Sequence, residues 1–134
     1  MRVDSRAFTE LPISLPGDGS PHEGEATPGE LLAAAYGSFF LEALAELLLG
    51  AGTPARELVV DVSCEISLVT AGHQVSEVDV SVHGRGERIE RGAFEGAAQE
   101  ALESCRISVG TADRIPFLLR AHLLEPVDEA LPDG

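Results

Sequence analysis

Residues 27–50, TPGELLAAAYGSFFLEALAELLLG, decide the fold of this chain. Thr27 is a suitable N-cap, Pro28 suits the first position of a helix, and Glu30 follows at the spacing of a capping box. We therefore expect a helix that begins at Pro28 and ends near Leu49, where glycine and proline become frequent.

Apolar side chains cover most of the circumference of this expected helix, with Glu42 and Glu46 as charged interruptions. A helix that is apolar on nearly all sides has to be buried all round, which exceeds the cover that one small sheet provides. We therefore expect a homodimer with this helix near its centre. Because the two glutamates break the apolar run, we expect no membrane span.

The composition limits the classes of function. The 134 residues suit one domain with its own core. Nine Arg, with no Lys, stand against 23 acidic residues and give a net charge of -14, which argues against nucleic acid and anionic membranes as partners. The lack of Lys excludes Schiff-base and P-loop lysines. Residues 1–4 mix charges where a secretory signal is basic, so we expect a cytoplasmic protein.

Three segments are expected along the chain. Residues 1–26 are rich in Pro and Gly, which is typical of an extended arm. Residues 27–124 carry the periodic patterns of a folded domain, and residues 125–134 form a loose C-terminal tail.

Within the domain, apolar and polar residues alternate over residues 58–68 and 78–83, which predicts a β-hairpin with a loop at 71–73. Matching the apolar faces of the two strands places Val80 opposite Cys64 and directs the Cys64 side chain into the core.

After the hairpin the periodicity becomes helical. Apolar residues from Phe94 to Cys105 form one stripe, which predicts a second helix with Cys105 at the end of its core-facing side. A last strand is expected from about Pro116 to Leu124. This order fits an α+β domain with both helices packed on a mainly antiparallel sheet.

Few side chains form patterns that carry chemistry. The four His lack the spacing of a metal site, and we expect neither a metal ion nor a cofactor. The hairpin register puts His83 across from Asp61, as an exposed pair rather than a catalytic dyad. Glu42 and Glu46 share a helix face, either as a solvated stripe or as paired carboxylates.

The two cysteines differ in their surroundings. Cys64, on the core face of a strand, is most simply a small buried hydrophobe. Cys105 is followed by Arg106, whose charge could stabilise a thiolate, so both a core role and a redox role stay open for Cys105.

Two stretches carry a family resemblance. TPGEL at residues 27–31, followed by AAAYGSFF at 33–40, resembles the first helix of the OsmC/Ohr family of osmotically inducible and organic hydroperoxide resistance proteins. There the pattern is Asn-Pro-Glu-Glu-Leu, then small residues, then Cys-Phe. Residues 94–108, which end in Cys-Arg-Ile-Ser, are similar to the family's stretch ending in Cys-Pro-Val-Ser. The likeness covers residues 24–124 and implies an intertwined homodimer with two central helices wrapped by sheets.

The resemblance also implies which parts of the family's chemistry this chain keeps. The family attacks organic hydroperoxides with a peroxidatic cysteine in the first helix and resolves the product with a cysteine in the second. Cys105 falls on the resolving position, whereas Phe39 falls on the peroxidatic one. Gly29 takes the place of a glutamate that positions an activating arginine, and Glu30 lies one residue out of that register. Two-cysteine peroxidase turnover is therefore expected to be blocked.

The first of three readings is an OsmC-like protein of the oxidative-stress family that has lost its peroxidase activity. It would bind an apolar small molecule or a protein partner in the old substrate pocket, lined by Tyr36, Phe39 and Phe40.

Two enzymes are the alternatives. One is a peroxiredoxin-like one-cysteine peroxidase that reduces organic hydroperoxides through Cys105, with an external thiol as reductant. Arg106 and Glu30 are further candidates for its site. The other is a hotdog-type thioesterase that uses Glu42.

Overall fold

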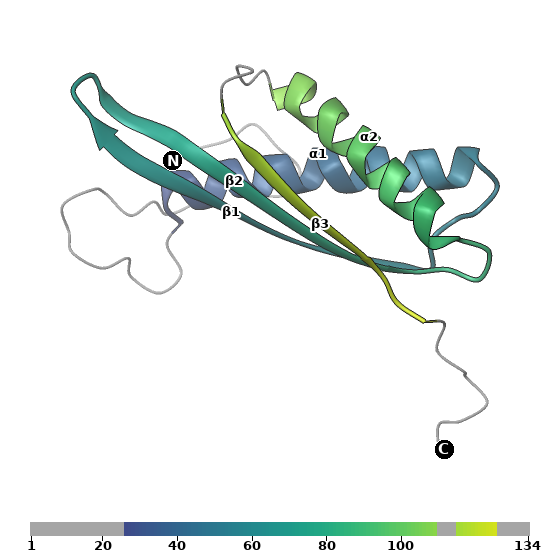
Figure 1. Ribbon diagram of the computed structural model, residues 1–134. Coiled ribbons are helices and arrows are strands. Elements are labelled where there is room, and N and C mark those ends of the chain that lie inside the picture. Colours follow the sequence, from purple (N-terminus) through teal and green to yellow (C-terminus); the bar gives the residue numbers. More distant parts are fainter. Residues whose placement is uncertain (1–25, 110–114, 126–134) are drawn as a thin grey trace.

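The computed structural model describes residues 26–109 and 115–125, so the predicted arm and most of the predicted tail lie outside the described residues. Two helices lie on one face of a three-stranded sheet (Figure 1). The elements in chain order are α1 (Pro28–Gly50), β1 (Glu57–Val69), β2 (Gly72–Arg85), α2 (Arg91–Val109) and β3 (Phe117–Leu123). The α+β class and the order of elements are confirmed.

The start of α1 is the predicted capping box. The backbone N–H of Glu30 donates to Thr27 Oγ1 at 3.1 Å, and the N–H of Thr27 donates to Glu30 Oε1 at 2.8 Å. Each side chain thus satisfies a donor that the first helical turn leaves without a partner. At the other end the helix stops at Gly50, and Gly52 then adopts a φ of 79°, which glycine tolerates best.

The sheet is mixed, in the order β1-β2-β3. Strands β1 and β2 form the predicted antiparallel hairpin, but β3 pairs with β2 in parallel. The expectation of a mainly antiparallel sheet therefore holds for one of the two described pairings. The reason is α2, which carries the chain back across the sheet, so that β3 runs in the same direction as β2.

The hairpin register differs from the prediction by two residues. Cys64 pairs with Val78 rather than with Val80, because the turn lies at residues 70–71 rather than at the predicted 71–73. A bulge at Glu65/Ile66 also shifts the ladder by one residue. A shift of two keeps residues 58–64 on their predicted faces. Beyond the bulge the faces are reversed, so Ile66 and Leu68, which were predicted to point inward, are exposed. The predicted His83–Asp61 pair is wrong, because Asp61 lies opposite Ser81.

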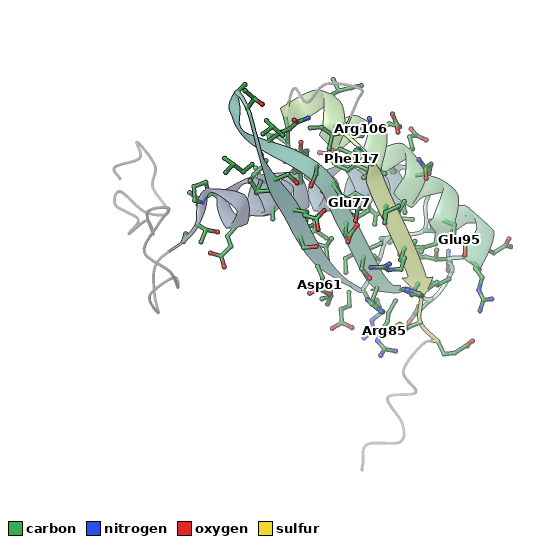
Figure 2. The ribbon with its side chains drawn as sticks, turned by 60° about the vertical axis from the view of Figure 1, so that its left-hand side comes forward. Asp61, Glu77, Arg85, Glu95, Arg106 and Phe117 are labelled. Atoms are coloured by element: carbon green, nitrogen blue, oxygen red, sulfur yellow. The ribbon has the colours of Figure 1, made fainter. Side chains whose placement is uncertain are left out.

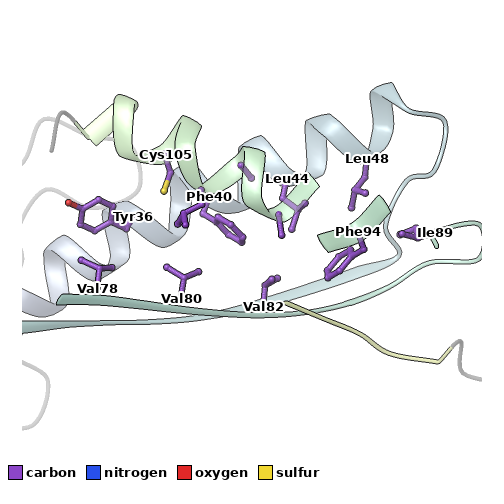
Figure 3. Close-up of a cluster of buried hydrophobic side chains, with 13 residues drawn as sticks. Tyr36, Phe40, Leu44, Leu48, Val78, Val80, Val82, Ile89, Phe94 and Cys105 are labelled. Carbon is purple, nitrogen blue, oxygen red and sulfur yellow. The ribbon is translucent and has the colours of Figure 1, made fainter. Parts of the chain in front are cut away.

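The core lies between the helices and the sheet (Figure 3). Helix α1 contributes one buried row, β2 contributes its inward valines, and α2 closes the cluster from above. The largest fully buried side chains are Tyr36, Phe40, Leu44, Leu48, Val78, Val80, Val82, Phe94 and Cys105.

The rest of α1 is not covered by its own chain. Phe39 is 41% exposed and Leu49 is 66% exposed. Among the described residues, α1 is the one helix long and apolar enough to cross a membrane. The expectation that Glu42 and Glu46 exclude a membrane span therefore does not hold by length and composition. Core helices pass the same test of length and composition, and the buried row of α1 packs into the core.

Candidate functional site

A cavity of about 700 Å³ lies between the first turns of α1 and the hairpin. From α1 it is lined by Gly29, Glu30 and Ala33, and from the strands by Cys64 and Ile66, among others. Its walls are mainly apolar, and its volume falls in the range of small-molecule pockets.

Small residues face β1 along one side of α1. Gly29, Ala33 and Gly37 are four residues apart and so lie on one face of the helix, toward β1. At Gly37 a Cβ atom would lie 3.3 Å from Val62 Cγ2, so the helix and strand are in close contact there. At Gly29 a Cβ would lie 3.4 Å from Ile66 Cγ1, so α1 passes close to β1 there as well. Of these three residues, Gly29 and Ala33 line the cavity and Gly37 does not.

Cys64 brings a thiol to this cavity. The residue is half-buried on β1, and burial raises the pKa of its thiol above the ordinary value of 9.0. The thiol is therefore protonated at neutral pH. Cys64 packs against the core, as its position on the inner face of the strand predicted, and it also lines the cavity.

Cys105 lies elsewhere, fully buried in the core beside Phe40 (Figure 3). Burial raises the pKa of Cys105 to about 11, and the nearby charge of Arg106 lowers it by less than burial raises it. Cys105 does not line the cavity. The two thiols are therefore in separate environments, and both are protonated at neutral pH.

Arg106 packs on an aromatic ring of β3. Its guanidinium carbon lies 4.7 Å from the ring centre of Phe117, and its Nη1 is 3.5 Å from Glu103 Oε2 (Figure 2). Tyr36 meets the same ring edge-on, with centroids 5.1 Å apart. These contacts give Arg106 a role in packing, as a cation over an aromatic face.

The three aromatic residues predicted to line a pocket are divided by the helix. Tyr36 and Phe40 are fully buried in the core, while Phe39 lies on the exposed side of α1. None of the three aromatic residues lines the cavity. The residues of α1 that do line it come earlier in the helix, between Pro28 and Ala33.

The remaining candidates lie apart from the cavity, except for Glu30. Glu30 caps the helix through its carboxylate and is also one of the residues that line the cavity. Glu42 and Glu46 are exposed on α1. His83 stacks on His122 of β3, with ring centroids 4.8 Å apart. Within residues 26–109 and 115–125, no group of three or more His, Cys, Asp or Glu side chains is arranged to hold a metal ion.

The cavity was missed at the sequence level, although part of its signal was present. Three small residues at a spacing of four on an otherwise bulky helix indicate a close approach or a gap beside that helix. The sequence does not show which strand residues lie against these three small residues, because that depends on the hairpin register.

No model of a known protein family matches the sequence, and no curated protein matches it either. Solved structures do match. The chain is similar to an organic hydroperoxide resistance protein from Elizabethkingia anophelis, crystallised with thiocyanate bound. The TM-score is 0.66 and the identity 22%, over 84% of this chain and 79% of that one.

Two further structures agree. The organic hydroperoxide resistance protein OhrB of Bacillus subtilis matches with a TM-score of 0.59 and 17% identity, over 84% of this chain and 80% of that one. An OsmC-like protein of unknown function from Vibrio cholerae matches with a TM-score of 0.66 and 13% identity, over 85% and 75%. At such identities the likeness shows the fold. The chain has the OsmC/Ohr fold, as the resemblance in its sequence implied.

Proposed function

We propose that this chain is a member of the OsmC/Ohr group that has lost two-cysteine peroxidase activity and binds an apolar small molecule. The observation that carries the proposal is the cavity of about 700 Å³ at the start of α1, whose walls are mainly apolar and which holds a protonated thiol. A pocket of this kind binds by burying apolar ligand surface rather than by reacting with the ligand.

The loss of peroxidase activity follows from the resemblance together with the state of the remaining thiol. Phe39 and Gly29 replace the two residues on which the family's first step depends. With a pKa of about 11, Cys105 is ionised in roughly one molecule in ten thousand at pH 7, and only the thiolate attacks a peroxide. The geometry therefore gives no support to a one-cysteine peroxidase.

We also propose that the protein acts as a cytoplasmic homodimer. Both cysteines are free, as is usual in a reducing compartment. The exposed apolar residues of α1, with Phe39 at 41% and Leu49 at 66% exposure, form a surface that a second copy would cover.

Binding can be tested with a fluorescent apolar probe, because the chain has no Trp to interfere with its emission. The probe should bind saturably to the wild-type protein. Ala33→Leu fills the cavity and should weaken binding by at least about tenfold. Ala93→Leu makes the same change on an exposed position of α2 and serves as the matched control. Equal binding by both variants would contradict the proposed site.

Loss of activity is tested in the same preparation. Cumene hydroperoxide with a dithiol reductant should give no turnover above the buffer rate. Wild-type turnover that disappears in Cys105→Ser would establish the one-cysteine peroxidase instead.

A further inference from the structure

We propose that the cavity selects uncharged apolar ligands with a single polar head, such as long-chain alcohols, and discriminates against carboxylates of the same length. This inference rests on the proposed function, because it concerns the ligand class of that cavity. It is carried by the position of Glu30 and by the uncharged polar groups that share the lining.

The charge at the cavity is negative. Glu30 is the one ionisable carboxylate among the lining residues, and none of the six described Arg residues lines the cavity: Arg56, Arg85, Arg88, Arg91, Arg106 and Arg120. A ligand carboxylate would enter this space beside a like charge with no described cation to pair with it. Such an arrangement is unfavourable because like charges repel, and the exposure of Glu30 to water reduces the repulsion without removing it.

The Glu30 carboxylate is also held in place. Its Oε1 accepts the N–H of Thr27 at 2.8 Å, while its own N–H donates to Thr27 Oγ1 at 3.1 Å. Moving the carboxylate away from an anionic ligand would break one half of the capping box. The negative charge is therefore a fixed feature of the cavity.

The N-terminus of α1 offers few free donors to an anionic ligand. Anions bind helix N-termini through free backbone N–H groups, and here few remain. Pro28 has no N–H, Glu30 donates to the Thr27 side chain, and Leu31 donates to the Thr27 carbonyl at 3.0 Å. The N–H of Gly29 is the first-turn donor that these capping interactions do not use. A single donor suits one neutral oxygen better than an anion.

Uncharged polar groups complete the lining. The amide of Gln74 and the thiol of Cys64 both border the cavity, and the Cys64 thiol is neutral at physiological pH. A hydroxyl head can donate to or accept from such groups while its chain lies along the apolar wall.

The test compares 1-decanol with decanoate as competitors of the bound fluorescent probe at pH 8, where decanoate is fully ionised. Decanol should displace the probe at a concentration at least about tenfold lower than decanoate. Glu30→Gln removes the charge but keeps the capping box, because Gln serves at the same position. This variant should bind decanoate several-fold more tightly and leave the affinity for decanol unchanged.

Glu46→Gln is the matched control, because it removes the same charge from an exposed position of the same helix. It should leave both affinities unchanged. Decanoate binding as tightly as decanol to the wild-type protein would overturn this inference and leave the proposed function standing. Displacement by neither compound, with no effect of Ala33→Leu on the probe, would overturn both.

Discussion

At the scale of single residues, the two cysteines show how position sets chemistry. Both lie on faces that the alternation in the sequence directs inward, and both thiols have raised pKa values because of burial. They differ in access: Cys64 is half-buried at the cavity wall, whereas Cys105 is fully buried on the inner face of α2.

We expect this difference to set the order of alkylation. With iodoacetamide at pH 8, Cys64 should be modified first and Cys105 only slowly, because its pKa of about 11 leaves little thiolate and the native packing must open. Mass spectrometry of the peptides at successive times measures both rates. Raising the pH toward 11 should accelerate the alkylation of Cys105 more than that of Cys64. The reason is that the pKa of Cys105, about 11, keeps this thiol protonated until that pH range. Faster labelling of Cys105 at pH 8 would show that it is activated after all.

Sequence patterns could predict which face a residue occupies but not what covers it. Phe39 and Phe40 are adjacent residues of the same type on one helix, so residue type alone does not distinguish the buried one from the exposed one. The structure buries Phe40 completely and leaves Phe39 at 41% exposure. The difference arises from the direction in which α1 meets α2 and the sheet, which is a tertiary property.

At the scale of elements, local signals predicted local structure well. The capping box of α1 was predicted from Thr27 and Glu30 because both partners lie within one turn. The hairpin register was missed by two residues because it depends on turn length and on the bulge at Glu65/Ile66. The parallel pairing of β3 had a signal that was overlooked, namely a helix between two strands.

Strand β2 and helix α2 meet at a glycine, which gives a prediction for their packing. A Cβ atom at Gly84 would lie 2.6 Å from Phe94 Cε1 and 3.0 Å from Leu58 Cδ2. Phe94 is fully buried and has no room to move, so Gly84→Ala should destabilise the protein by about 1–3 kcal/mol. The free energy of unfolding in urea measures this change.

Gly96→Ala is the matched control for this substitution. Gly96 lies inside α2, and a Cβ atom there would meet nothing within 4 Å. Alanine should therefore stabilise the helix by up to about 1 kcal/mol. If Gly84→Ala proved as harmless as Gly96→Ala, the close contact between Phe94 and β2 would be contradicted.

At the scale of the whole molecule, the sheet carries helices on one face and leaves the hairpin turn projecting beyond them (Figures 1 and 2). Large apolar side chains are exposed on this hairpin end, including Leu68 at 77%, as well as along α1. Apolar surface of this extent on a single chain is typical of an interface. The long apolar helix in the sequence predicted the need for cover, but a single sequence does not say which surfaces meet.

We expect the wild-type protein to sediment at micromolar concentration with twice the mass of the 14.1 kDa chain. Phe39→Glu should shift it toward the monomer, because a carboxylate buried in an apolar interface loses its hydration without gaining a partner. Gln99→Glu adds the same charge to an exposed position of α2 and should leave the dimer intact. A wild-type monomer would mean that α1 keeps its apolar side in water. A dimer unaffected by Phe39→Glu would instead place the interface on the projecting hairpin, where Leu68→Glu should then separate the subunits.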